Sequence, residues 1–529
     1  MPTCGSARSP IRYCLSSALV TFVLVLSLTG AVWSQSQPAQ SQPAPTPKSS
    51  TQPQATTPVP GAGVAVQNQP SQTGSGQSAE QPKPESRISK AQAKDLFRSV
   101  DEILQFVSQD TGLPIKHQVK RRLITREEVE KYVDKQMKDD KDKKRLEQSK
   151  LVLEKFGLLP PDYDLHSEFL RLMAEQVAAY YDPKTKSVNL LDWVQPDVQK
   201  PILAHELTHA LQDQMVGVEK WELAGAKDDA TPLPDQQEYV VEEEQAARQC
   251  VTEGQGMAAM FDYTLAPLGK DILTAPEYVD AVRAAMGDSK DSPVFDQAPM
   301  FLKESLLMPY TFGLDFVRSV MAKQGKDAAF AGILEKPPID TRQVMQPQTY
   351  LMHVAVPPLK VPDLNQIIAP DYRRFDFGGM GEFDIYLLAK QYGADDTPNY
   401  YRHWRGGYYF AAHKKGAPKD QIAMLFFTHW DSPEAAYDFA KLYADYVPNR
   451  YPDGVKWTAT CPDAAAAGSG RTMNCITMSA VTKEGPVLIQ RHDDDLLILE
   501  GYDAEVMQKA RKVLFSPAPP SAQAGTAKN

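Results

Sequence analysis

The chain has 529 residues, of which 42% are hydrophobic, and a formal net charge of -10 at pH 7. This length predicts two to four domains with ordinary globular cores. Because the chain is mildly acidic and no basic face dominates, the composition argues against nucleic acid as the main partner.

The N-terminal segment, 1–34, places Arg8 and Arg12 before an apolar run from Leu15 to Val32. A positive start, an apolar stretch and a small residue before a polar segment are typical of a secretory signal peptide. We expect cleavage between Ser34 and Gln35 and export to the periplasm or the extracellular space. The run is long for a signal peptide, so the alternative is an uncleaved helix that anchors the chain in a membrane.

Residues 35–86 consist mainly of Gln, Ser, Pro and Thr, with almost no large apolar side chains. Such a segment cannot bury enough surface to offset its ordering entropy, which predicts a disordered linker. Residues 516–529 are expected to form a flexible tail.

Cys461 and Cys475 lie in one domain of an exported chain, so a disulfide and two unpaired cysteines are both open interpretations. Cys250 is expected to be a buried thiol.

The folded part is expected to begin near residue 87 with a helix that contains Leu96, Val100 and Val107 at helical spacing. A short strand is expected at 116–123, and TREE at 125–128 is typical of a capping box that opens a charged, solvated helix. A helix at 165–177 precedes two strands, at 177–181 and 187–191, which the turn DPKT joins.

These patterns predict an α+β protein of two domains. Residues 87–350 form a mainly helical domain with a small antiparallel hairpin, and residues 351–376 form a proline-interrupted connector. Residues 377–515 form a smaller α+β domain. Its strands are expected at 408–412, 422–428, 475–482, 487–491 and 496–500, and its helices at 433–446 and 504–515.

The stretch LAHELTHALQDQ, at 203–214, places His205 and His209 four residues apart with Glu206 between them. With Pro201 in the first turn of a helix, the leucines share one face and the two imidazoles share nearly the opposite one. Two imidazoles one turn apart can bind one tetrahedral zinc ion, and Glu206 can act as the base toward a metal-activated water. Since only 9 residues are histidine, a chance match is on the order of one in a hundred.

A third protein ligand is needed, and neither Gln212 nor Met215 supplies another histidine. Glu253 precedes Gly254 on a helix expected at 237–263, on a face with small or neutral neighbours that permit close approach. We expect Glu253 to be the ligand, with Glu242 on the same face as the alternative. The run Glu242, Glu243 and Glu244 is otherwise interpreted as a solvated helix start, with Glu243 and Glu244 pointing elsewhere.

The segments HELTHALQDQ and TEG, in this order, resemble the gluzincins, zinc metallopeptidases whose ligands are two histidines and a downstream glutamate. More narrowly, YYDPKTKSVNLL, VTEGQGMA, MPYTFG and KPPIDT occur in the order found in exported bacterial proteins of that clan. The similarity spans roughly residues 90–500. This sequence departs from the pattern in two places: EGQG replaces the more usual EGDA, and Gln346-Pro347 replaces His-Pro.

The resemblance implies two further roles. Residues 188–191 would be the edge strand with which a substrate peptide pairs, although a plain structural hairpin is the alternative. Tyr310 would stabilise the oxyanion of the tetrahedral intermediate, or else pack within its helix. Asp213 would orient a metal ligand, or else make a surface or interhelix contact.

The sequence therefore predicts an exported peptidase with one Zn²⁺ ion, held by His205, His209 and Glu253, that acts on a peptide or protein. The alternative is a non-catalytic zinc protein for binding or envelope assembly, in which the C-terminal domain, with its segment WRGGYYFAAH, performs the function. A third interpretation, attachment to glycan or cell wall, depends only on export and the linker.

Overall fold

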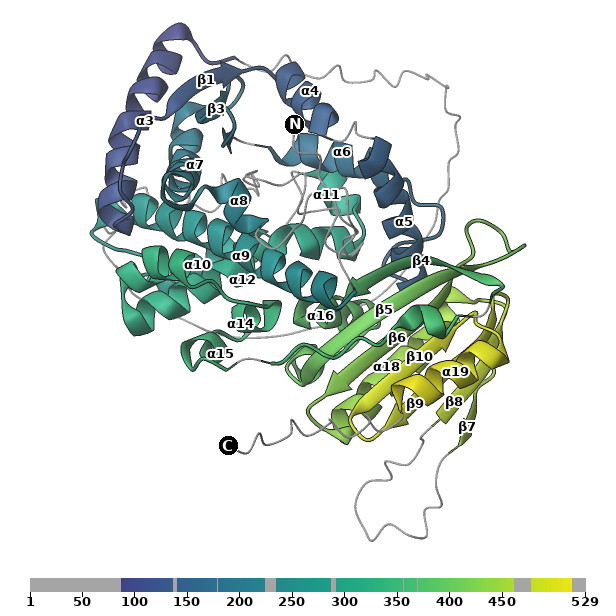
Figure 1. The fold of residues 1–529 in the computed structure, drawn as a ribbon. Helices are drawn as coiled ribbons and strands as arrows, with labels where there is room; N and C mark the ends of the chain where they lie inside the picture. The colour runs from purple at the N-terminus through teal and green to yellow at the C-terminus, as the bar shows by residue number, and fades with distance from the viewer. Residues whose placement is uncertain are drawn as a thin grey trace, which may run out of the picture.

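The computed structural model describes residues 87–136, 140–177, 179–223, 235–286, 292–354, 356–368, 370–460 and 477–515. The predicted signal peptide, linker and tail lie outside the described residues, as do Cys461 and Cys475. The chain is an α+β protein, in which a helical unit with a small sheet precedes a larger antiparallel sheet (Figure 1). Within the described ranges, no helix has both the length and the apolarity needed to cross a membrane.

The helical unit is built from long helices that cross near its centre. Its helices are α3 (Lys90–Thr111), α4 (Arg126–Gln136), α5 (Asp140–Phe156), α6 (Leu165–Gln176), α7 (Pro196–Val216), α8 (Val218–Glu222), α9 (Asp235–Leu265), α10 (Pro276–Met286), α11 (Pro293–Gln297), α12 (Met300–Gln324), α13 (Ile333–Glu335), α14 (Thr341–Met345) and α15 (Pro347–Leu351). A π-helical turn, η2 (Ala328–Gly332), follows α12, and the predicted capping box forms between Thr125 and Glu128 at the start of α4.

The small sheet consists of β1 (Lys120–Ile124), β2 (Ala179–Asp182) and β3 (Ser187–Leu191) in the order β1-β3-β2. Strand β3 pairs in parallel with β1 and antiparallel with β2, so the sheet is mixed and not purely antiparallel. The prediction that residues 188–191 form an edge strand is therefore wrong, because a second strand covers that side. Pairing with a strand that lies far earlier in the chain leaves no local trace in the sequence.

Helix α7 begins at Pro196, so the prediction that Pro201 lies in its first turn is wrong. Pro201 lies inside the helix, where it has no N–H to donate to the carbonyl of Asp197. The helix is buried continuously from Ile202 to Asp213 and ends at Gly217, whose φ of 71° is the left-handed conformation that glycine adopts readily.

The C-terminal sheet has seven antiparallel strands in the order β4-β5-β6-β10-β9-β8-β7. Its elements are β4 (Tyr372–Gly379), α16 (Glu382–Gln391), α17 (Pro398–Tyr401), β5 (Trp404–Lys414), β6 (Ala423–Trp430), α18 (Pro433–Arg450), β7 (Thr458–Thr460), β8 (Thr477–Thr482), β9 (Gly485–His492), β10 (Asp495–Glu500) and α19 (Ala504–Leu514). Strand β4 begins inside the predicted connector. Helix α19 lies across one face of the sheet, and α18 packs on β6, β9 and β10 (Figure 1).

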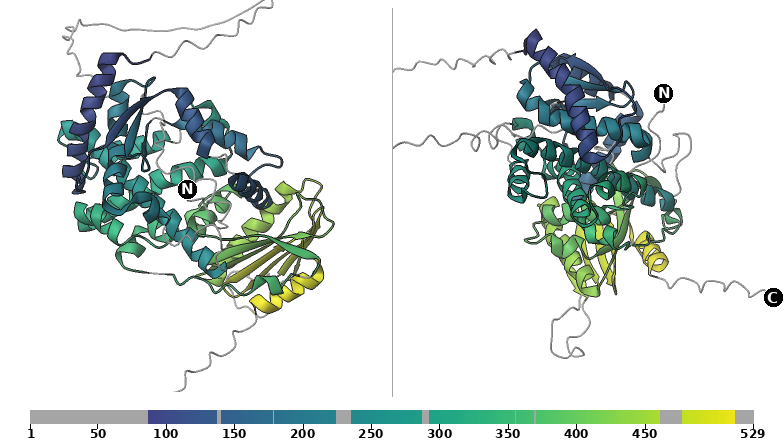
Figure 2. Two further views of the ribbon diagram at one scale, coloured as in Figure 1. Left: turned by 45° about the horizontal axis from the view of Figure 1, so that its top comes forward. Right: turned by 90° about the vertical axis from the view of Figure 1, so that its left-hand side faces the viewer.

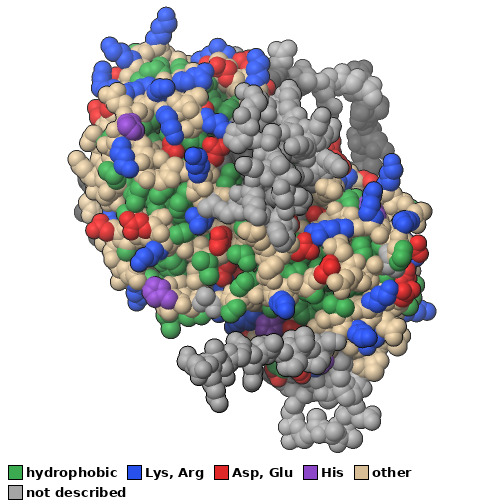
Figure 3. Space-filling view, viewed as in Figure 1, with side chains coloured by type: hydrophobic (Ala, Val, Ile, Leu, Met, Phe, Trp, Pro, Cys, Tyr) green, Lys and Arg blue, Asp and Glu red, His purple; other side chains and the backbone are tan. Residues whose placement is uncertain are grey.

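One apolar cluster is common to both units, beside a second cluster between the sheet and α19. The shared cluster of buried apolar side chains extends from Ile88 to Ile498. In both views of Figure 2, α3 lies at the end of the molecule remote from the sheet. Over the visible face of the sheet unit, acidic and basic side chains are interspersed (Figure 3).

The first turns of α9 join the helical unit to the sheet. Arg374 on β4 donates to both carboxylate oxygens of Asp235, at 3.1 and 2.7 Å. Glu242 accepts the backbone N–H of Gly379 at 2.9 Å, and Glu243 accepts the backbone N–H of Thr341 at 2.9 Å. Both glutamates are buried, so the interpretation of this run as a solvated helix start is wrong for these two.

A buried ionic network connects α5 with the sheet unit. Glu500 on β10 is fully buried and lies 2.7 Å from Arg450 and 3.6 Å from Lys155. Lys155 also lies 2.6 Å from Glu484. Burial opposes ionisation of Glu500, but Arg450 and Lys155 outweigh it and lower its pKa from 4.5 to about 2.

We expect Glu500→Gln to lower the free energy of unfolding at pH 7 by about 3–5 kcal/mol, because the buried Arg450 loses its carboxylate partner and Lys155 keeps only Glu484. A lowered folded-state pKa gives stability that is present above about pH 4.5 and is lost as the pH falls toward about 2. Urea unfolding of both proteins should therefore show a smaller difference at about pH 3 than at pH 7. A difference that does not change with pH would contradict this account of the network.

Candidate metal centre

Three donor atoms converge in the interior between α7 and α9. The Nε2 atom of His205 lies 2.9 Å from Nε2 of His209 and 3.0 Å from Oε2 of Glu253, and His209 Nε2 lies 3.4 Å from the same carboxylate oxygen. Bonds of 2.0–2.1 Å in a tetrahedral zinc site would separate the donors by about 3.3 Å. The three side chains therefore fit a single small cation.

The electrostatics of the group also favour a cation. Burial disfavours charge on His209, but the facing Glu253 carboxylate outweighs burial and raises the pKa of His209 to about 9. Burial likewise opposes ionisation of Glu253, and His209 and His205 reverse this and lower its pKa to about 2. The carboxylate is thus ionised and draws positive charge to the point where the three donors meet.

Glu206 follows His205 on α7 and is fully buried. Its Oε2 accepts the backbone N–H of Tyr181, on β2, at 2.6 Å. Its Oε1 has no hydrogen-bond partner within the described part of the chain. Burial, more than any other effect, raises the pKa of Glu206 to about 8. One oxygen is therefore fixed by the backbone, and the raised pKa makes the carboxylate a strong proton acceptor.

Tyr310 on α12 also lies at the donors. Its ring centroid is 6.1 Å from that of His205, and its hydroxyl hydrogen-bonds to Glu253. Burial is the largest cause that raises the pKa of Tyr310 well above 10, and the charge of Glu253 is the second. The hydroxyl therefore keeps its proton. The tyrosine is both a packed helical residue and a hydrogen-bond donor beside the site, so its predicted catalytic role stays a prediction.

Three glycines allow the helices to approach this closely. A Cβ at Gly254 would lie 2.3 Å from the backbone of Gly313 on α12, and a Cβ at Gly313 would lie 2.2 Å from the carbonyl oxygen of Cys250. A Cβ at Gly256 would lie 2.7 Å from the ring of His205. The glycines of α9 therefore place Glu253 and His205 within reach of each other.

The other predicted candidates lie elsewhere. Glu242 and Glu243 bind the backbone of Gly379 and Thr341, so neither is placed with the histidines. Asp213 accepts hydrogen bonds from Tyr181 at 2.8 Å and Lys186 at 2.6 Å. It therefore binds the β2–β3 hairpin, whereas Nδ1 of His209 binds Gln212 and Nδ1 of His205 has no hydrogen-bond partner among the described residues.

Sequence reasoning missed two groups near the donors. Glu222 on α8 is half-buried, and its Oε1 accepts the hydroxyl of Thr252 at 2.5 Å. Burial raises the pKa of Glu222 to about 7. Gln212 binds His209 Nδ1 at 2.8 Å. No sequence pattern marks Glu222. The position of Gln212, one turn after His209, is the signal that could have indicated its contact with that ring.

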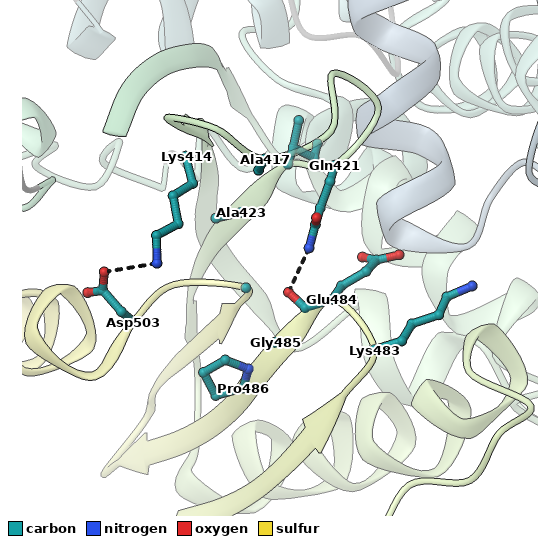
Figure 4. Close-up of a pocket in the computed structure, with 11 residues that line it drawn as sticks. Lys414, Ala417, Gln421, Ala423, Lys483, Glu484, Gly485, Pro486 and Asp503 are labelled. Atoms are coloured by element: carbon teal, nitrogen blue, oxygen red, sulfur yellow. Dashed lines mark hydrogen bonds and ion pairs between the residues drawn. The ribbon is translucent and has the colours of Figure 1, made fainter. Parts of the chain in front are cut away.

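Two further features lie in the sheet unit. An open pocket of about 330 Å³ is bounded by the β5–β6 and β8–β9 turns and by Gly501 (Figure 4). Its Lys414 lies 3.6 Å from Asp503, and it shares no residue with the metal donors. His429 also lies 2.8 Å from Asp495, with Asp494 at 4.0 Å, in a more exposed cluster than the buried one.

Comparisons of the chain with protein-family models, with curated proteins and with solved structures found no match.

We expect Gly256→Ala to lower the zinc affinity of the chain by roughly 10-fold or more, because the new methyl group displaces the His205 ring. The matched control is Gly332→Ala, where the nearest atom to an added Cβ, Asp327 O, lies at an ordinary 3.5 Å. Competition with a fluorescent chelator measures both affinities. Parent-like affinity in Gly256→Ala would show that the ring position does not depend on this glycine.

Proposed function

We propose that this chain is a zinc-dependent peptidase. The observation that carries the proposal is the convergence of His205 Nε2, His209 Nε2 and Glu253 Oε2 within 3.4 Å of one another, beside a buried carboxylate oxygen of Glu206 that has no partner in the described part of the chain. Catalytic zinc sites combine three protein ligands with a fourth position for water or substrate. The predicted export of the chain remains a proposal from the sequence of its N-terminal segment.

His205, His209 and Glu253 would hold the ion. When bound, zinc supplies Lewis acidity that polarises a peptide carbonyl and lowers the pKa of water. Glu206 takes a proton from the attacking water on Oε1, while Tyr181 N–H holds Oε2 in place. The protonated Glu206 then delivers that proton to the leaving amine. Tyr310 keeps its proton and donates a hydrogen bond to the oxyanion that forms as water adds to the carbonyl.

The burial of all three donors supports a second candidate, a structural zinc site in a protein with another activity. Structural zinc sites are closed by four protein ligands, whereas the donor group found among the described residues has three members. The two candidates differ in the importance of Glu206, since a structural site has no use for a proton acceptor.

Glu206→Gln is expected to retain about one zinc per chain and to lose peptide hydrolysis by roughly 10²–10⁴-fold, because the amide cannot accept the proton. Zinc content and cleavage of a mixed peptide library by the full chain measure the two effects. The matched control is Glu242→Gln, a buried glutamate on α9 that binds Gly379 and should keep both zinc and hydrolysis. Undiminished hydrolysis in Glu206→Gln would refute the catalytic role of Glu206 and favour the structural site.

Tyr310→Phe is expected to lower kcat by about 10²-fold with little change in KM, because the ring is kept and only the hydroxyl donor is lost. Steady-state kinetics on a peptide identified from the library measures both constants. Equal kcat values in the parent and the variant would make Tyr310 a packing residue.

A further inference from the structure

The amide of Gln255 has only one consistent orientation. Its Nε2 lies 2.8 Å from the carbonyl oxygen of Ala329 and 3.0 Å from that of Phe330, both in the π-helical turn η2. A flipped amide would place its own oxygen against two carbonyl oxygens. Both N–H groups are therefore used by the backbone, and Oε1 of Gln255 can only accept a hydrogen bond.

Gln212 is oriented in turn by Gln255. Its Nε2 donates to Gln255 Oε1 at 2.8 Å and to the carbonyl oxygen of Thr252 at 3.1 Å. These two acceptors use both of its N–H groups. The oxygen of Gln212 therefore faces Nδ1 of His209, 2.8 Å away, and needs a donor there. Only an Nδ1–H group on His209 satisfies this contact.

We propose that Gln212 and Gln255 are positioning residues, forming a neutral chain of amides that fixes His209 as the Nδ1–H tautomer and directs its Nε2 lone pair to the metal. The inference depends on the metal centre in the proposed function and assigns the groups that orient one of its ligands. It also gives EGQG a physical meaning, since Gln255, which stands where the more usual EGDA has an aspartate, acts through Gln212.

The two histidine ligands are held differently. Nδ1 of His205 has no hydrogen-bond partner among the described residues, and the ring is confined by the backbone of Gly256. His209 instead depends on hydrogen bonds that reach η2 through two amides. Groups that hydrogen-bond to the outer nitrogen of a metal-binding histidine fix its orientation, and their loss costs roughly 10- to 100-fold in metal affinity.

Position 255 could require an amide that donates to η2, or it could be better filled by an acid. These two interpretations predict opposite changes in zinc affinity for Gln255→Glu. A carboxylate there would face the carbonyl oxygens of Ala329 and Phe330 without a hydrogen to donate. The amide chain therefore predicts that Gln255→Glu lowers zinc affinity roughly 10- to 100-fold. If position 255 were instead better filled by an acid, as in EGDA, the same variant would bind zinc more tightly.

The experiment measures zinc affinity of the full chain by chelator competition for the parent, Gln255→Glu, Gln212→Leu, Gln255→Leu and the double leucine variant. The matched control is Gln245→Glu, also buried on α9 and two to three turns before Gln255. We expect weaker zinc binding in every site variant, no additional loss in the double variant and parent-like binding in the control. Histidine-selective ¹⁵N spectra of the zinc-loaded parent should show a proton on Nδ1 of His209, with Gln212→Leu identifying its signal.

Urea unfolding of the metal-free variants separates loss of metal affinity from loss of the fold. If the parent binds zinc and the site variants bind it equally or more tightly, the amide chain is overturned, but the metal centre is not. Additive losses in the leucine variants, or a bare Nδ1 on His209, would also overturn it. A folded parent that binds no zinc would overturn the proposed function, and this inference with it.

Discussion

Burial of the Glu253 carboxylate against two imidazoles is the constraint on which the site depends. An ionised carboxylate in the interior is costly unless opposite charge is close by. The ionised form is maintained here because His205 and His209 face it, and the same geometry makes the three side chains suited to one cation. The surrounding architecture brings α7 and α9 close enough for this contact.

Each part of the fold contributes to that approach. Gly254 and Gly313 let α9 and α12 cross backbone to backbone, and Gly256 gives the His205 ring its space. The hairpin is bound to α7 through Asp213, and it supplies the N–H that holds Glu206. The sheet unit binds the first turns of the helix that carries Glu253, so it supports the site from a distance.

The sequence predicted the features of the site that depend on local spacing. The interval between His205 and His209 places both rings on one face of α7, and the small neighbours of Glu253 correctly indicated a close helix contact. Strands β5, β6, β8, β9 and β10 of the second sheet were also predicted, whereas the short β7 and β4, with Arg373, Arg374 and Asp376 inside it, were not.

Local sequence patterns could not predict the contacts between segments that are distant in the chain. The position of β3 between β1 and β2 depends on a parallel pairing, and the burial of Glu242 and Glu243 depends on Gly379 and Thr341 packing against them. The function of Gln255 required the carbonyl groups of η2, which lie beyond the whole of α12 in the chain. Such contacts decide whether a polar residue is a solvated side chain or part of a buried network.

Anomalous diffraction at the zinc absorption edge, from crystals of the full chain, tests the central claim most directly. The account predicts one strong anomalous peak bonded to His205 Nε2, His209 Nε2 and a Glu253 oxygen at about 2.0–2.2 Å. A peak elsewhere in the chain, or none between these residues in zinc-supplemented crystals, would contradict it.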